Sequence, residues 1–281
     1  MKFGNCISYK DINRIKILKK TGFDYVEIGL SSLYTAEKSE IENFLGALDK
    51  NNIKCEAVNV IFPGGIKLTG ENAEFEKAEN YIAEIFEKTK SIGFKYVVFG
   101  SGGARRVPDG FPMEEAKEQL IKIINDYLIP AAEKYDFTVV VEELNKAETN
   151  IINTIDEAEY IVEKINNPKI KLLADLYHIG LENEDISKLS EKGSILAHCH
   201  IANPYNKRSY PQKSDSAKAK ELYKIFFENL KKASYQKGIS IEGSPGGLEN
   251  INEIKIPDWV KEEDKLFYAE SKKSLEFIKS Y

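Results

Sequence analysis

The side chains in this sequence that could bind a metal ion or move protons are concentrated in its second half. All the histidines fall there, and several short apolar runs stop on an acidic residue. The members of this group are His178, His198, His200, Glu142, Asp175 and Glu242. Carboxylates and imidazoles together suit a divalent cation such as Mn²⁺, Mg²⁺ or Co²⁺. Without a cation, gathered carboxylates would repel one another, and one of them would have to take up a proton.

The apolar runs that precede these residues are short and rich in β-branched side chains, which predicts strands. The predicted strands cover Lys2–Ile7, Tyr25–Gly29, Lys54–Val60, Tyr96–Gly100, Thr138–Glu142, Ile170–Ala174, Ile195–Ile201 and Ile239–Glu242. Between and after them, apolar residues recur at helical spacing, most clearly in Ala73–Ser91, Glu114–Tyr135, Ile155–Ile165, Ala217–Ala233 and Lys261–Ser280. The chain is therefore predicted to alternate strands with helices.

About eight such βα units in 281 residues are typical of one α/β fold, the (β/α)₈ TIM barrel, which commonly has about 250 residues. An open doubly wound sheet would normally carry a glycine-rich loop after its first strand. Here the first strand leads into Ser8, Tyr9 and Lys10 instead. No shift in composition and no linker marks a boundary. We therefore predict a single barrel domain over residues 1–281, with an extra C-terminal helix on its outside.

A parallel barrel brings the carboxyl ends of its strands to one mouth, where TIM-barrel enzymes hold their active sites. Four consecutive predicted strands end on or beside a possible metal ligand: Glu142, Asp175, His200 and Glu242. His198 and His200 are two residues apart, so both should point into the mouth while Cys199 points outward. A single acidic residue after a strand is usually a helix N-cap, and a single histidine is usually a core residue. The succession of four favours a metal site.

Four segments of the second half carry a family resemblance. They are Val141–Glu148 (VEELNKAE), Ala174–His178 (ADLYH), His198–His200 (HCH) and Ile241–Gly243 (IEG). Together they resemble the xylose isomerase-like TIM-barrel superfamily, and within it the small sugar isomerases and ketose 3-epimerases of the D-tagatose and D-psicose epimerase type. The motifs lie within residues 138–243, and the alternation of strands and helices extends the resemblance over most of the chain.

The resemblance implies a divalent-metal-dependent sugar isomerase or epimerase. The implied ligands of one metal ion are Glu142, Asp175, His200 and Glu242. Mn²⁺ is the expected ion, with Mg²⁺, Co²⁺ and Zn²⁺ as alternatives. Glu142 and Glu242 are also the implied catalytic acid and base, on opposite faces of a sugar whose proton transfer passes through a metal-bound enediolate. His178 and Glu148 match positions that contact substrate in the family.

Arginine is rare in this chain, since only four of its 40 basic residues are arginine. Arg105 and Arg106 lie side by side in the glycine-rich segment Gly100–Pro108, a combination suited to binding a phosphate or carboxylate of the substrate. The alternative is a turn in which one arginine holds a neighbouring carboxylate. Arg208 stands two residues later than an arginine that contacts substrate in the family. His198 completes the candidate substrate contacts.

Three further polar residues lie within predicted strands. Glu27 is inside Tyr25–Gly29 and is expected to face the barrel lumen or to form an ion pair. The same expectation applies to Glu56 and Asn59, which lie inside Lys54–Val60. Each is a weaker candidate for contact with substrate.

The composition argues against two kinds of partner. A net charge of −5 and an isoelectric point near 5.5 provide no basic surface for nucleic acid or an anionic membrane. No apolar run approaches the roughly 20 residues of a membrane span, and Met1–Gly4 begins without a signal peptide's apolar region. The three cysteines are odd in number, as expected of a reduced, cytoplasmic chain. The expected partner is a small sugar or sugar phosphate. The sequence leaves open whether the chain forms a homo-oligomer.

Three other functions compete with a sugar isomerase. A dehydratase acting on an inosose-like keto-polyol would use the same metal and bases, so it stays open. A non-catalytic sugar- or metal-binding barrel is disfavoured because binding alone does not need two glutamates beside one ion. A zinc endonuclease acting at abasic DNA sites is disfavoured because its three zinc ions need more ligands than the three histidines of this chain supply. It also needs a basic groove for DNA.

Overall fold

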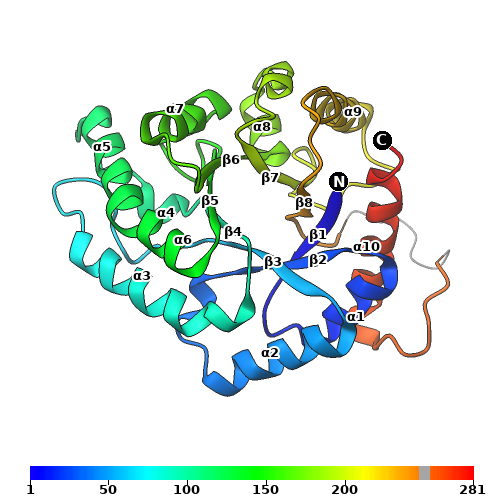
Figure 1. The fold of residues 1–281 in the computed structure, drawn as a ribbon. Coiled ribbons are helices and arrows are strands. Elements are labelled where there is room, and N and C mark those ends of the chain that lie inside the picture. The colour runs from blue at the N-terminus through cyan, green and yellow to red at the C-terminus, as the bar shows by residue number, and fades with distance from the viewer. Residues whose placement is uncertain (247–253) are drawn as a thin grey trace.

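Eight parallel strands form a closed barrel in the part of the chain that the structure describes (Figure 1). The structure is a computed structural model that describes residues 1–246 and 254–281. The strands are β1 (Lys2–Ile7), β2 (Tyr25–Gly29), β3 (Lys54–Asn59), β4 (Tyr96–Phe99), β5 (Thr138–Glu142), β6 (Ile170–Asp175), β7 (Leu196–Ile201) and β8 (Gly238–Ile241). Each strand pairs with the next, and β8 pairs with β1. The prediction of a (β/α)₈ barrel is confirmed.

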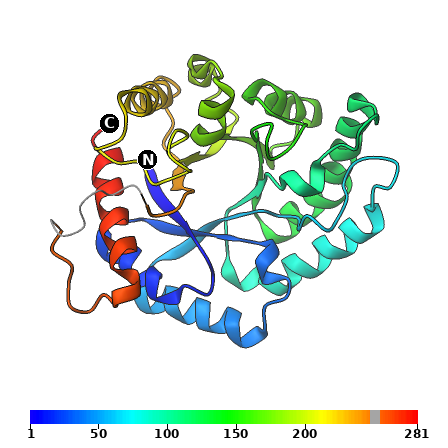
Figure 2. The same cartoon turned by 180° about the vertical axis from the view of Figure 1, so that it is seen from behind.

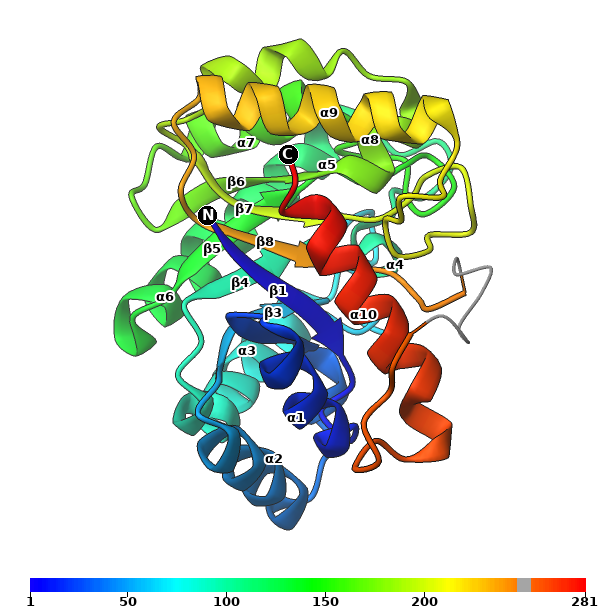
Figure 3. The same ribbon diagram turned by 90° about the vertical axis from the view of Figure 1, so that its right-hand side faces the viewer.

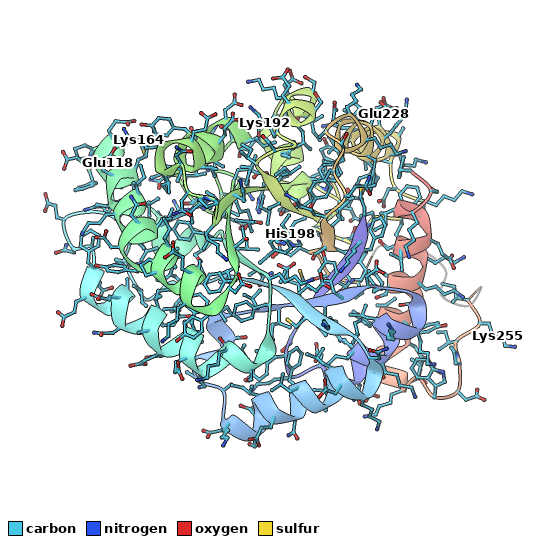
Figure 4. All side chains as sticks on the ribbon, viewed as in Figure 1. Glu118, Lys164, Lys192, His198, Glu228 and Lys255 are labelled. Carbon is cyan, nitrogen blue, oxygen red and sulfur yellow. The ribbon has the colours of Figure 1, made fainter. Side chains whose placement is uncertain are left out.

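Helices surround the barrel on its outside (Figures 1 and 2). In the described residues they are α1 (Ile12–Thr21), α2 (Lys38–Asn51), α3 (Phe75–Thr89), α4 (Gly102–Arg105), α5 (Met113–Ile123), α6 (Ile129–Tyr135), α7 (Ile155–Ile165), α8 (Leu176–Glu182), α9 (Ala217–Lys232) and α10 (Lys265–Ile278). Exposed charged side chains such as Glu118, Lys164 and Glu228 lie on their outer faces (Figure 4). None of the helices in the described ranges combines the length and apolar composition that a membrane crossing requires.

The last helix, α10, lies against the outside of the barrel. It packs along α1, close to where the chain begins (Figure 3). Its buried residues include Phe267, Leu275 and Ile278, which recur at helical spacing and face the barrel side. The predicted extra C-terminal helix is confirmed.

The predicted helix Glu114–Tyr135 is divided in the structure. A π-helical turn over Ile124–Leu128 separates α5 from α6. Pro130 stands in the first turn of α6 and has no N–H to donate to a carbonyl of the preceding turn. The wider π turn accommodates the missing hydrogen bond. Apolar periodicity predicts the helix but does not reveal this change of pitch.

The inward-facing positions of the strands change from apolar to polar toward the mouth. A small apolar cluster, separate from the main core outside the sheet, consists of Val98, Val140, Leu173 and Ala197. Alternate residues of a strand share a face. Two residues beyond Val140 and Leu173, the same face therefore presents Glu142 and Asp175. The apolar cluster thus lies beneath the acidic residues at the mouth.

Glu184 is expected to make stability depend on pH. Its Oε1 accepts a hydrogen bond of 2.9 Å from the N–H of Ile155, at the start of α7. Its Oε2 is buried and makes no hydrogen bond with the described residues. Burial raises the pKa of Glu184 from 4.5 to about 7, so the folded protein keeps a proton that the unfolded chain releases over this range. The free energy of unfolding should therefore fall as the pH rises from about 4.5 to about 7.

Urea unfolding of the wild type and of Glu184→Gln over this pH interval tests the expectation. Glutamine keeps an acceptor for the N–H of Ile155 but cannot ionise, so stability should fall less with rising pH in the variant. An equal fall of the free energy of unfolding in both proteins would show that Glu184 does not cause the pH dependence.

Candidate metal centre

Four side chains from four successive strands meet at the mouth of the barrel. They are Glu142, Asp175, His200 and Glu242. One possible ligand atom from each lies within 4.8 Å of the others, a separation that one cation can bridge. Asp175 and His200 are completely buried, whereas the side chain of Glu242 is 19% exposed. The group is therefore shielded from bulk solvent but open toward the mouth on the side of Glu242.

The strand register explains why these residues meet. Asp175 pairs directly with His200 across β6 and β7. Glu142 pairs with Leu173, two residues before Asp175, so Glu142 and Asp175 face the same side. Glu242 follows β8, and its N–H donates a 3.2 Å hydrogen bond to the last carbonyl of β7. Parallel pairing of neighbouring strands thus brings together ligands that are far apart in the sequence.

The His200 ring is oriented by Glu27 on β2. Nε2 of His200 lies 2.9 Å from Oε1 of Glu27. The opposite nitrogen, Nδ1, lies 2.9 Å from Oε1 of Glu142 and 3.3 Å from Oε2 of Glu242. Burial by itself raises the pKa of Glu27, but His200 and His198 lower it below the ordinary glutamate value. Glu27 therefore stays charged and accepts from Nε2–H. Burial lowers the pKa of His200, but Glu27, Glu242 and the hydrogen bond to Glu142 raise it well above the ordinary histidine value. Without a cation Nδ1 therefore carries a proton and donates to Glu142, and it becomes a metal ligand when that proton is lost.

Asp175 both caps a helix and faces the ligand group. Its Oδ1 accepts a 2.9 Å hydrogen bond from the N–H of Tyr177 at the start of α8. Its own N–H donates to Oε1 of the buried Glu143 at 2.8 Å. These bonds hold the carboxylate so that only Oδ2 is directed toward the site. Asp175 can therefore cap α8 through one oxygen and offer the other as a metal ligand.

Two neighbours set the positions of the glutamates. A Cβ atom on Gly100 would lie 2.1 Å from Oε2 of Glu142, so a glycine after β4 is needed to leave space for this carboxylate. Asn59, at the end of β3, donates a 2.8 Å hydrogen bond from Nδ2 to Oε1 of Glu242. Asn59 therefore contacts the site, whereas Glu56 on the same strand pairs with Lys2 and Lys95 away from it.

His178, in α8, is held as a neutral hydrogen-bond donor. Its Nδ1 lies 3.1 Å from the N–H of Asn145 and 2.8 Å from its Nδ2, so the proton belongs on Nε2. Nε2 is buried, makes no hydrogen bond within the described residues, and lies 3.4 Å from Oδ2 of Asp175. Burial and the charge of Arg208 lower the pKa of His178 to about 3. Asn145 was not predicted as a site residue. Its position in the loop after β5, where TIM barrels hold their active-site residues, could have indicated it.

Arg208 and Glu148 lie together beside the ligand group. Nη2 of Arg208 contacts the carboxylate of Glu242 and lies 3.2 Å from Oδ2 of Asp175. Nη1 of Arg208 lies 3.6 Å from Oε1 of Glu148, a half-exposed carboxylate. The loops after β7 and β5 thus bring these two predicted substrate contacts to one side of the mouth.

Arg105 and Arg106 differ from the expectation that both reach toward substrate. Arg105 is completely buried, and its guanidinium donates to three main-chain carbonyls. The acceptors are Phe99 (3.0 Å), Glu142 (2.8 Å) and Ile152 (3.3 Å). This placement corrects the prediction for Arg105, which supports the ends of β4 and β5. Arg106 is exposed and donates to the carbonyl of Ala147 at 3.2 Å.

His198 lies in the interior of the barrel, whereas the prediction placed it at the mouth. It is completely buried, its Nε2 lies 2.9 Å from Oε2 of Glu27, and its ring stacks on Tyr96. It faces inward like His200 but stands two residues earlier on β7. This placement corrects its assignment as a substrate contact. The lumen position of Glu27 agrees with the sequence prediction, and its role in holding both histidines comes only from the structure.

A closed barrel whose strand ends gather ionisable side chains around one point has the architecture of a TIM-barrel enzyme. Comparison with family models defines the type of barrel, because residues 15–263 match the model described as xylose isomerase-like TIM barrel. The chain belongs to this family, and the resemblance inferred from its motifs is confirmed.

Individual relatives include sugar epimerases. The 3-dehydro-D-guloside 4-epimerase of Escherichia coli K12 is 25% identical over 244 residues, which are 83% of this chain and 86% of the relative. A D-psicose 3-epimerase from Clostridium cellulolyticum H10, solved with D-tagatose, has a TM-score of 0.79 at 18% identity over 100% of this chain and 99% of that one. This likeness shows the fold.

A nuclease relative also matches. A probable endonuclease 4 from Metamycoplasma arthritidis is 24% identical over 149 residues, 53% of this chain and 51% of the relative. The match to the E. coli epimerase covers more of both chains. The epimerase relatives support the expectation of an isomerase-class enzyme.

Proposed function

We propose that this protein is a divalent-metal-dependent sugar epimerase or isomerase. The observation that carries the proposal is the approach of Glu142, Asp175, His200 and Glu242, whose ligand atoms lie within 4.8 Å of one another. The epimerases among its relatives support a carbohydrate substrate. Within this class the proposed substrate is a ketose or keto-sugar that is small enough to enter the barrel mouth.

The donor set suits one divalent ion. Carboxylate oxygens favour Mn²⁺ and Mg²⁺, and an imidazole nitrogen also suits Co²⁺ and Zn²⁺. Mn²⁺ is our first choice because the set contains both kinds of donor, with oxygen in excess. When bound, such an ion would supply Lewis-acid chemistry to the carbonyl and hydroxyl oxygens of the sugar.

In this proposal Glu142 and Glu242 serve as the two catalytic carboxyl groups. They belong to the ends of β5 and β8, which are three strands apart in the closed barrel, so they approach the mouth from different sides. One carboxylate removes the proton next to the carbonyl carbon, and the carboxylic acid form of the other donates a proton to the opposite face. Donation to the same carbon gives epimerisation, and donation to the adjacent carbon gives aldose–ketose isomerisation.

The substrate would be oriented by polar groups around the two glutamates. Nε2–H of His178 is a fixed donor without a partner among the described residues, and a sugar oxygen would satisfy it. Arg208 and Glu148 offer a donor and an acceptor on the same side of the mouth. Only Arg106 of the arginine pair is exposed, so any phosphate would have to be held without Arg105.

Proton exchange in D₂O tests the proposal. Protein loaded with Mn²⁺ and protein stripped by a chelator are incubated with a panel of free and phosphorylated ketoses, and deuterium is located by NMR. We expect deuterium at C3 or C1 with the loaded protein, and at least about a hundredfold less after stripping, because a Lewis-acid cation contributes several kcal/mol to stabilising the developing charge and about 1.4 kcal/mol corresponds to tenfold in rate. Restoring the metal should restore exchange.

The same experiment separates the alternatives. A keto-polyol dehydratase would consume its substrate with release of water instead of producing an isomer mixture. A non-catalytic binding barrel would give no deuterium across the whole panel although the metal and sugar bind. Either outcome would overturn the proposed epimerase or isomerase activity.

A further inference from the structure

The two carboxylates that Arg208 contacts each have one oxygen already occupied by the protein. Oδ1 of Asp175 accepts from the N–H of Tyr177, and Oε1 of Glu242 accepts from Asn59. The remaining oxygens, Oδ2 of Asp175 and Oε2 of Glu242, are those that Nη2 of Arg208 contacts. Arg208 therefore holds the two oxygens that are best placed to bind a cation.

A guanidinium and a metal ion cannot share these oxygens without cost. Both are positive, both would lie within about 4 Å of the same carboxylates, and the surroundings are largely buried, so their mutual repulsion is only partly screened. Binding of a cation to all four ligands requires Arg208 to leave Asp175 and Glu242. This competition is independent of the sugar.

The guanidinium has two further contacts in the position that the structure shows. It lies over the ring of Tyr177, with its Cζ 4.6 Å from the ring centre, and its Nη1 is 3.6 Å from Glu148. Glu148 is 42% exposed and lies outside the four-ligand group. A shift of the guanidinium toward Glu148 would release the ligand oxygens while keeping an ion pair and the stacking on Tyr177.

The main chain at Arg208 is fixed, and its Nε donates a 3.0 Å hydrogen bond to the main-chain carbonyl of Glu242, so the movement concerns the two terminal nitrogens of the guanidinium. Lys207 and Arg208 both have left-handed backbone angles, with φ of 47° and 56°. The carbonyl of Arg208 accepts a 3.0 Å hydrogen bond from the N–H of Ser244. A Cβ on Gly243 would lie 2.4 Å from that carbonyl oxygen, which shows how closely the two loops pack.

From these contacts we propose that Arg208 is a built-in competitor of the divalent cation, and that cation binding displaces its guanidinium from Asp175 and Glu242 toward Glu148 and the substrate. The inference rests on the metal site of the proposed function, but not on the identity of the sugar. It gives Arg208 a role in metal affinity in addition to substrate contact. A residue that only held the ligands together would have the opposite effect on affinity.

Mn²⁺ titration without sugar tests this inference. Free Mn²⁺ is measured by EPR with the wild type, Arg208→Gln and, as a matched control, Arg106→Gln, which removes the same charge from an exposed arginine outside the ligand group. We expect Arg208→Gln to bind Mn²⁺ about tenfold or more tightly than the wild type, because a charge beside the ligands is removed. The control should match the wild type.

Thermal unfolding supplies a readout independent of activity. Without Mn²⁺, Arg208→Gln should melt at a lower temperature than the wild type, because its carboxylates lose a counter-charge. At the same concentration of added Mn²⁺, the rise in Tm should be larger in the variant, since stabilisation increases with affinity. If the variant folds only with Mn²⁺ present, its loss of Mn²⁺ to a competing chelator gives the affinity instead.

The outcomes separate this inference from the proposed function. Equal or weaker Mn²⁺ binding by Arg208→Gln, with normal binding by the wild type, would overturn the competition and leave the metal site intact. Absence of Mn²⁺ binding by all three proteins would overturn both the competition and the metal requirement. Tighter binding by Arg106→Gln as well would show a general charge effect and would overturn the specific role of Arg208.

Discussion

Replacing Glu242 with glutamine is expected to reduce the rate of proton exchange between a ketose and solvent by about 10²–10⁴-fold. Glutamine has nearly the same shape, and its amide oxygen can face the ligand group. It cannot take up or release a proton, however. The effect should therefore fall on kcat, and Glu142→Gln should behave in the same way because one glutamate cannot replace the other on its own side of the substrate.

The measurement is deuterium incorporation in D₂O with metal content determined on the same samples. Glu56→Gln is a matched control, because Glu56 lies on β3 but pairs with Lys2 at 2.8 Å, away from the ligand group. The control should retain wild-type exchange. If Glu242→Gln kept metal and near-normal turnover, the two-carboxylate scheme would be wrong.

Loss of the buried guanidinium in Arg105→Ala is expected to lower the free energy of unfolding by about 3–5 kcal/mol. Three main-chain carbonyls lose a charged donor, and a cavity replaces a large side chain that is 0% exposed. Burial lowers the pKa of Arg105 only to about 10, so it is protonated at neutral pH and these hydrogen bonds are charge-assisted. One acceptor is the carbonyl of Glu142, so activity should fall as well.

Urea unfolding followed by circular dichroism measures this loss, and the neighbouring arginine supplies the comparison. Arg106 is exposed and donates a single hydrogen bond, to the carbonyl of Ala147. Arg106→Ala should therefore change the free energy of unfolding by no more than about 0.5 kcal/mol. Similar losses in the two variants would contradict a supporting role specific to Arg105.

Much of the fold could be predicted because each barrel strand carries a local signal. Short β-branched runs alternating with helical periodicity predict eight strands, and the ends of the observed strands differ from the predicted ones by no more than one residue. The break between α5 and α6 could not be predicted in the same way. It depends on how Pro130 is accommodated within a helix that packs on the barrel.

The candidate ligands could also be predicted from sequence, for a reason that is topological. Parallel strands in a closed barrel end at one mouth, so Glu142, Asp175 and Glu242 meet because each lies at the end of its strand or directly after it. The motif resemblance implies His200 as the ligand, and its Nδ1 lies 2.9 Å from Oε1 of Glu142 within the candidate group. Here local position along each strand is sufficient.

How deep a side chain lies in the barrel, and which side chain it pairs with, could not be predicted in this way. Both depend on the register of strands that are far apart in the sequence. His198 and His200 share a face of β7, but the contact with Glu27 and the stacking on Tyr96 place His198 below the mouth. Two adjacent arginines look alike in the sequence, yet packing buries Arg105 and leaves Arg106 exposed. The chain's residue order thus determines the barrel and the residues that can meet at its mouth. Only the tertiary structure decides which side chains meet there, because side-chain contacts form between segments that the sequence keeps far apart.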